Sequence, residues 1–130
     1  MKNTSKKVII VSNSLFNIYN FRLNLVNFLL SQGYGVTLIA TKDDYFRYLK
    51  KLNVQIIPLE INSSTNIISN FKLLYNSYKI IKKLQPNLII TFTIKPNLYF
   101  SLIARILKID YINNIFGLGY FLINRSIVTK

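Results

Sequence analysis

Short apolar runs alternate along the chain with longer segments in which apolar residues recur every three or four positions. The runs have the length and β-branched content of strands buried on both faces of a parallel sheet. They lie at Lys7–Ser12, Val36–Ala40, Val54–Leu59, Leu88–Phe92 and Tyr111–Ile115. The segments between these runs, with apolar residues at every third or fourth position, are typical of amphipathic helices. We expect these helices at Ile18–Ser31, Asp43–Leu52, Ile67–Leu84 and Pro96–Leu107.

This alternation predicts the fold class. Strands at regular spacing with a helix between them imply right-handed crossovers and therefore an α/β, doubly wound parallel sheet, with the expected strand order 3-2-1-4-5. The 130 residues suffice for one compact domain and are too few for two. Phe121–Lys130 resembles the start of a sixth unit. Because the chain ends before that unit can pack, we expect Lys130 to mark a truncation.

The apolar stripes also predict which helix faces are buried. Gln32 and Gly33 form a stop signal after the first helix, and Pro96 is expected at the first position of the last helix. Residues expected to face the sheet are Ile18, Phe21, Leu25, Phe28 and Leu29 in the first helix, and Ile67, Phe71, Leu74, Tyr78 and Ile81 in the third. In the last helix, Leu98, Leu102 and Ile106 share one side.

The turn after Leu88–Phe92 is the first candidate binding site. In open parallel sheets, ligands bind beyond the carboxyl ends of the strands, where the next helix presents its N–H groups. Thr93, Lys95 and Asn97 lie at this position and offer a hydroxyl, an ammonium and an amide to phosphate or sugar oxygens. The alternative is that Thr93 and Asn97 are ordinary turn and cap residues.

Two further loops follow strands. The polar loop Asn13–Asn17 lacks the glycine fingerprint that lets the backbone wrap a pyrophosphate, which argues against a dinucleotide site, and we expect no cofactor. After the fifth predicted strand, Gly117 and Gly119 allow either positive φ and close approach to a ligand, or a plain turn.

Missing residue types exclude much chemistry. The chain has no cysteine and no histidine, so it has no disulfide, no Cys/His zinc site and no Ser-His or Cys-His catalytic pair. Its four carboxylates are Asp43, Asp44, Glu60 and Asp110. Only Asp43 and Asp44 are close in sequence, and they fit the start of a helix. Two-carboxylate hydrolysis and a metal site are therefore not expected.

The charge balance favours an anionic partner. The net charge is +13, with 17 basic residues against four acids. The basic residues are scattered and no nucleic-acid-binding motif is present, which argues against specific nucleic-acid recognition and favours anionic lipid head groups. Lys72, Lys79, Lys82 and Lys83 form either a solvated helix face or a binding surface. No apolar run approaches the ~20 residues of a membrane span. The run after the basic N-terminus, Val8–Val11, is far shorter than the ~7–15 residues of a signal-peptide core, so we expect a cytoplasmic protein.

Four motifs in order resemble a known family. They are Asn17-x-Tyr19-Asn20-Phe21-Arg22, Gly33-Tyr34-Gly35-Val36, Phe92-Thr93-Ile94-Lys95-Pro96-Asn97 and Asn113-Asn114-x-x-Gly117-Leu118-Gly119-Tyr120. The combination, which covers nearly the whole chain, resembles the amino-terminal domain of a bacterial family 4 glycosyltransferase. That resemblance implies one Rossmann-like half of a GT-B fold. The second half, which in the family binds the nucleotide-sugar donor, is not in this sequence.

The resemblance also implies an activity. The related enzymes transfer a sugar, with retention of configuration, from a nucleotide-sugar to a lipid-diphosphate-linked saccharide during capsule, O-antigen or protein-glycan assembly. Their amino-terminal domain holds the acceptor and touches the membrane, which implies a place on the inner face of the cytoplasmic membrane. No catalytic base can be carried over, because the retaining reaction of the family has no agreed protein nucleophile. Many members also have a histidine in the cleft between the domains, and this chain has none. We expect the chain alone to be inactive.

The resemblance assigns substrate-binding roles by position. Asn13, Asn17, Tyr19, Asn20 and Arg22 would face acceptor and donor phosphates, and Thr93, Lys95, Asn97, Asn113, Asn114, Gly117 and Gly119 complete the set along the interdomain cleft. The alternative function is a non-catalytic phosphate- or lipid-binding module, or an acceptor-binding subunit that needs a separate donor-binding partner.

Overall fold

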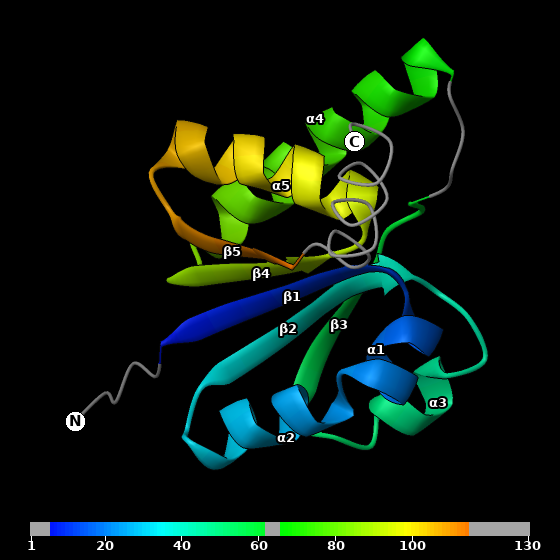
Figure 1. Ribbon diagram of the computed structural model, residues 1–130, viewed down its shortest axis with the longest axis vertical. Coiled ribbons are helices and arrows are strands. Elements are labelled where there is room, and N and C mark those ends of the chain that lie inside the picture. Colours follow the sequence, from blue (N-terminus) through cyan, green and yellow to red (C-terminus); the bar gives the residue numbers. More distant parts are fainter. Residues whose placement is uncertain (1–5, 62–65, 115–130) are drawn as a thin grey trace, which may run out of the picture.

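The computed structural model describes residues 6–61 and 66–114 and shows a five-stranded parallel sheet (Figure 1). The strands are β1 (Lys7–Ser14), β2 (Gly35–Thr41), β3 (Val54–Pro58), β4 (Leu88–Phe92) and β5 (Asp110–Asn114). Their order is β3-β2-β1-β4-β5, which confirms the predicted doubly wound topology. The helices are α1 (Leu15–Phe21), α2 (Leu23–Ser31), α3 (Phe46–Leu49), α4 (Ile67–Leu84) and α5 (Ile94–Leu107).

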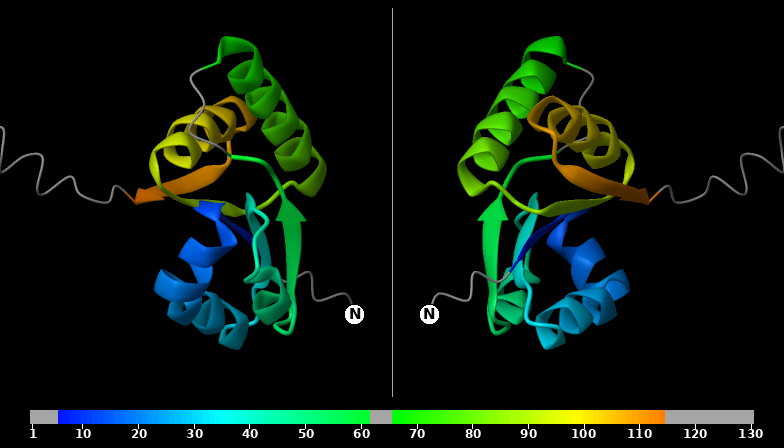
Figure 2. Two further views of the ribbon diagram at one scale, coloured as in Figure 1. Left: turned by 90° about the vertical axis from the view of Figure 1, so that its right-hand side faces the viewer. Right: turned by 90° about the vertical axis from the view of Figure 1, so that its left-hand side faces the viewer.

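The helices form two layers on opposite faces of the sheet, with α1, α2 and α3 on one side and α4 and α5 on the other (Figure 2). Successive residues of a strand point to opposite faces. In β1, Val8 and Ile10 accordingly pack against the first layer, and Ile9 and Val11 pack against the second. Both faces of the central strands are therefore buried, which explains their uninterrupted apolar runs.

The prediction of one helix over Ile18–Ser31, preceded by a loop over Asn13–Asn17, was wrong. The Ser14 hydroxyl accepts a hydrogen bond from the Asn17 N–H at 3.1 Å, so that Ser14 caps a helix that begins at Leu15. Arg22, with φ −125° and ψ 8°, then separates α1 from α2. Gly33 stands at φ +85° just after α2, and it ends that helix as predicted.

Several predicted inward faces were also wrong. Phe21, Phe28, Ile67 and Phe71 are exposed. On α5, for which no inward side was predicted, the side that carries Leu98, Leu102 and Ile106 is exposed. The buried residues of α4 are Leu73, Ser77 and Ile81, and those of α5 are Pro96, Phe100, Ile103 and Ala104. Both helices carry apolar residues at helical spacing on more than one side, so periodicity did not identify the side that faces the sheet.

Asp43 joins the loop after β2 to the first turn of α1. One carboxylate oxygen accepts the Phe16 N–H at 2.8 Å, and the other accepts the Tyr45 N–H at 2.9 Å. The helix predicted from Asp43 to Leu52 is limited to Phe46–Leu49, because the carboxylate holds the preceding residues in a turn. Asp43 therefore stabilises the first turn of α1 as well as its own loop.

We predict that Asp43→Ala lowers the free energy of unfolding by about 2–3 kcal/mol, because two hydrogen bonds to a charged acceptor are lost. The measurement is urea denaturation followed by circular dichroism. Asp44→Ala is the matched control, because Asp44 is exposed and its removal should cost less than about 0.5 kcal/mol. Equal losses in the two variants would contradict the bridging role.

Candidate functional site at the carboxyl edge of the sheet

The site predicted from sequence lies where β1, β4 and β5 end and where α1 and α5 begin (Figure 1). Between Val11 and Ser14, β1 contains one residue more than β2 does between Ile39 and Thr41. Such a bulge re-aims side chains and often adjoins functional sites. Asn13 lies in it with an exposed side chain, whose oxygen is 3.4 Å and 3.5 Å from the hydroxyls of Ser12 and Ser14.

Asn17 lies in the first turn of α1, and its side-chain oxygen is buried. Among the residues that the structure describes, this oxygen has no hydrogen-bond partner. An unmade hydrogen bond at a buried acceptor costs about 1–3 kcal/mol. Asn17 therefore retains an unused acceptor beside the end of β1.

Arg22 reaches the end of β4. Its guanidinium carbon lies 4.1 Å from the centroid of the Phe92 ring, a cation–π contact with the last residue of that strand. A guanidinium presents planar pairs of N–H donors that match phosphate oxygens. The contact with Phe92, which sequence reasoning did not identify, holds this cation next to Thr93.

The first turn of α5 differs from those of α1 and α4. Ser14 and Asn66 cap those two helices with their side chains, whereas the Thr93 side chain makes no such bond, since its hydroxyl donates to the Phe92 carbonyl oxygen. Thr93 has φ +73°, a conformation that is rare and costly for a β-branched residue. The Thr93 side chain thus leaves the helix start uncapped, and the positive dipole end of α5 is directed at the edge.

The position predicted for Pro96 was wrong by two residues. The helix begins at Ile94, so Pro96 occupies its third position. This placement is tolerated because the N–H that proline lacks would have no partner within the first turn of the helix. The backbone N–H groups of Ile94 and Lys95 therefore belong to the first turn.

Lys95 is held between two helices. Its ammonium donates to the side-chain oxygen of Asn70 on α4 at 2.9 Å. The contact therefore fixes the position of a positive charge at the start of α5. Asn70 was not predicted, and a polar residue in the first two turns of α4 was its only sequence signal.

Thr91 is the centre of a polar network that sequence reasoning missed. Its hydroxyl oxygen lies 2.6 Å from the Asn97 side-chain oxygen and 2.7 Å from the Asn113 side chain. The Asn97 nitrogen donates to the Asn114 carbonyl oxygen at 2.9 Å, so the Asn97 oxygen is the group that accepts the single Thr91 proton. The Asn113 side-chain oxygen, 2.7 Å from the same hydroxyl, is a second acceptor within reach of that proton.

This network gives Asn97, Asn113 and Asn114 a structural role. Asn114 also donates from its side chain to the Thr91 carbonyl oxygen, at 3.4 Å. Together these bonds tie β4, β5 and the first turn of α5 to one another. Both ends of the Asn97 amide are used within the protein, so Asn97 positions the helix start that a ligand would meet.

Some predicted residues lie elsewhere. The Tyr19 ring packs against Tyr45 and Tyr48, with centroids 5.2 Å and 5.4 Å away, and so belongs to an aromatic cluster with α3. The Asn20 side chain donates to the Phe16 carbonyl oxygen of its own helix at 2.9 Å. Gly117, Gly119 and the predicted sixth unit lie outside the described residues.

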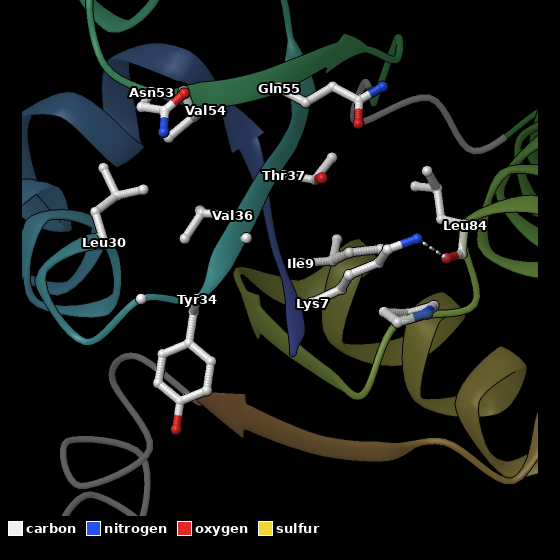
Figure 3. A pocket seen from close by; sticks show the side chains of 13 residues that line it. Lys7, Ile9, Leu30, Tyr34, Val36, Thr37, Asn53, Val54, Gln55 and Leu84 are labelled. Atoms are coloured by element: carbon white, nitrogen blue, oxygen red, sulfur yellow. Dashed lines mark hydrogen bonds between the residues drawn. The ribbon is translucent and has the colours of Figure 1, made fainter. Parts of the chain in front are cut away.

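A cavity of about 730 Å³ lies at the opposite edge of the sheet, around the first residues of β1, β2 and β3 (Figure 3). There the Lys7 ammonium donates to the Leu84 carbonyl oxygen at 3.4 Å, at the end of α4. Helix C-termini carry partial negative charge, which disfavours an anionic ligand. We therefore place the candidate site at the carboxyl edge.

Comparison with known proteins identifies the family of the chain. A family model described as Glycosyl transferase 4-like matches residues 7–129. The chain belongs to this family. The sequence resemblance is thereby confirmed at the level of the glycosyltransferase family. No curated protein matches the chain.

Solved structures share the fold. MurG from Acinetobacter baumannii is 20% identical with a TM-score of 0.66, and the match covers 85% of this chain and 35% of MurG. A glycosyltransferase from Rickettsia africae is 16% identical with a TM-score of 0.69 over 83% of this chain and 29% of its own. UDP-GlcNAc 2-epimerase from Methanocaldococcus jannaschii is 20% identical with a TM-score of 0.60, over 83% and 30%. The chain thus spans about a third of the length of these proteins.

We predict that Thr91→Val and Asn97→Ala are not additive. Each change breaks the same hydrogen bond, so the double variant should be less destabilised than the sum of the single variants by at least about 1 kcal/mol. Urea denaturation of the four proteins measures this coupling. Additivity within about 0.3–0.5 kcal/mol would contradict the network.

Proposed function

We propose that the chain is the acceptor-side domain of a retaining glycosyltransferase that transfers a sugar from a nucleotide-sugar to a lipid-diphosphate-linked saccharide. In this proposal a second domain holds the donor, and the reaction serves the assembly of surface polysaccharide or glycan. The observation that carries the proposal is the start of α5, which the side chain of Thr93 does not cap and which Lys95 and Arg22 flank, in a chain that belongs to the Glycosyl transferase 4-like family.

The chemistry of the edge suits both substrates. A nucleotide-sugar and a lipid diphosphate each carry phosphate oxygens, which favour backbone N–H groups, a helix dipole and basic side chains. Asn13 adds an exposed amide that can form hydrogen bonds with sugar hydroxyls. Phosphate binding is thus assigned to the start of α5, and sugar binding to the end of β1.

The proposal includes a peripheral position on the inner face of the cytoplasmic membrane. None of the helices in residues 6–61 and 66–114 is long and apolar enough to cross a bilayer. The net charge of +13 would draw the domain to anionic head groups, since each basic residue near the surface contributes about 1 kcal/mol. A lipid-linked acceptor would be met at that surface.

We predict that Lys95→Ala weakens the binding of farnesyl diphosphate by roughly ten- to a hundredfold, because one charge-assisted contact is worth about 1.5–3 kcal/mol. Isothermal titration measures the affinity. Lys83→Ala is the matched control, because it also removes one positive charge but lies in the last turn of α4, at the other edge of the sheet. If the two variants lose affinity equally, the effect is general electrostatics and the phosphate site is assigned wrongly.

Flotation with liposomes tests the membrane part of the proposal. At low ionic strength we expect the chain to float with anionic vesicles and not with neutral ones. Salt of about 1 M should release it, because screening then acts over about 3 Å. Equal flotation with both lipid compositions would contradict attraction by anionic head groups.

A further inference from the structure

Two exposed phenylalanine rings lie together on the outside of α1. Phe16 in its first turn is 46% exposed, and Phe21 at its end is 61% exposed. The ring centroids are 6.4 Å apart at an interplanar angle of 76°, which is a favourable edge-to-face contact. Neither ring belongs to the hydrophobic core on its side of the sheet. We call Phe16 and Phe21 the α1 aromatic pair, and exposed apolar surface that gathers beside polar groups is typical of a binding site.

The start of α1 holds the pair in place. The Phe16 N–H donates to the Asp43 carboxylate at 2.8 Å, and the Ser14 hydroxyl caps the same turn. The Phe16 ring also contacts the Tyr45 ring, with 5.3 Å between centroids, where α1 and α3 lie side by side (Figure 1). A ligand would therefore meet rings that the fold has already positioned, at little further cost in side-chain entropy.

The pair adjoins the proposed phosphate site. Arg22 directly follows Phe21, and its guanidinium carbon lies 4.1 Å from the centroid of the Phe92 ring. Phe92 is the last residue of β4, and Thr93 and the start of α5 come next. In a lipid-diphosphate-linked saccharide, the first sugar is bonded directly to a phosphate oxygen. Side chains that recognise this sugar must therefore lie next to the groups that hold the phosphate.

Two amide side chains flank the pair. The Asn20 nitrogen donates to the Phe16 carbonyl oxygen at 2.9 Å, whereas the Asn20 side-chain oxygen has no hydrogen-bond partner among the residues that the structure describes. Asn13, three residues before Phe16, is exposed at the end of β1. Sugar hydroxyls can form hydrogen bonds with such amides, and the C–H groups of a sugar ring favour the negative face of an aromatic ring. A prenyl chain could use only the rings, so the combination favours a saccharide.

We propose that the α1 aromatic pair stacks against the first sugar of the acceptor and selects a lipid diphosphate that already carries a saccharide. The inference rests on the proposed function and names the part of the acceptor that this site recognises. Arg22 and the start of α5 hold the diphosphate, the pair covers one face of the sugar ring, and the amides of Asn13 and Asn20 bind its hydroxyls. Phe16 and Phe21 are thus specificity-determining residues, whose contribution is lost when the acceptor has no sugar.

Isothermal titration with two probes tests the inference. The probes are farnesyl diphosphate and N-acetylglucosaminyl farnesyl diphosphate, which differ by one sugar. We expect Phe16→Leu and Phe21→Leu each to weaken binding of the sugar-bearing probe by about five- to tenfold, because the aromatic face is lost while an apolar side chain remains. The affinity for farnesyl diphosphate should change by less than about twofold. Phe21→Tyr keeps the ring and should bind both probes as the unaltered chain does.

Phe28→Leu is the matched control. Phe28 is 58% exposed in the same helical layer, but it lies in the last turn of α2, near the edge where β2 begins. Its replacement should leave the affinity for both probes unchanged. Circular dichroism and thermal melts check that each variant is folded.

Three results would overturn the inference. If the leucine variants bind both probes as the unaltered chain does, the pair takes no part in binding. If they lose the same factor for both probes, the rings contact the prenyl chain and the sugar assignment is wrong. In both of these cases the phosphate site and the proposed function stand. If the unaltered chain binds neither probe, the proposed phosphate site fails and the inference fails with it.

Discussion

The turn from β4 into α5 is the constraint on which the site depends. β4 lies between β1 and β5, its Thr91 and Phe92 are buried, and a single residue separates it from the next helix. Thr93 makes this turn possible with a left-handed backbone, and the bonds from Thr91 through Asn97 and Asn113 stabilise it. This network offsets the free-energy cost of the strained Thr93 backbone and also fixes the position of β5. The result is a helix start that the side chain of Thr93 does not cap.

Sequence periodicity was sufficient to predict the order of strands and helices. Because β1 and β4 are buried on both faces, their sequences are unbroken apolar runs. The helix boundaries needed more information. Ser14 caps α1 only because Leu15 and Ile18 are buried in the core of the folded chain. The positive φ of Thr93 could not be predicted from sequence, because threonine normally avoids that conformation. In α4, the exposed stripe through Ile67 and Phe71 is as periodic as the buried one.

The position of the candidate site was predicted better than the roles of its residues. Arg22, Thr93 and Lys95 do gather at the end of β4, as the rule for parallel sheets indicates. Asn97 and Tyr19 proved to be structural, and their partners Thr91 and Tyr45 adjoin them only in the folded chain. The same fold also occurs in a UDP-GlcNAc 2-epimerase and in a hydrogenase domain from Pyrococcus furiosus. Membership of the glycosyltransferase family, rather than the sheet alone, therefore supports the function.

We propose that the carboxyl edge of the sheet, and not the cavity at the opposite edge, binds the diphosphate. Amide chemical shifts of the ¹⁵N-labelled chain during titration with farnesyl diphosphate test it most directly. We expect the amides of Thr93, Ile94 and Lys95 to shift first, while those of Tyr34 and Gln55 at the opposite cavity stay in place. Saturable shifts at Tyr34 and Gln55, with the start of α5 unchanged, would contradict it.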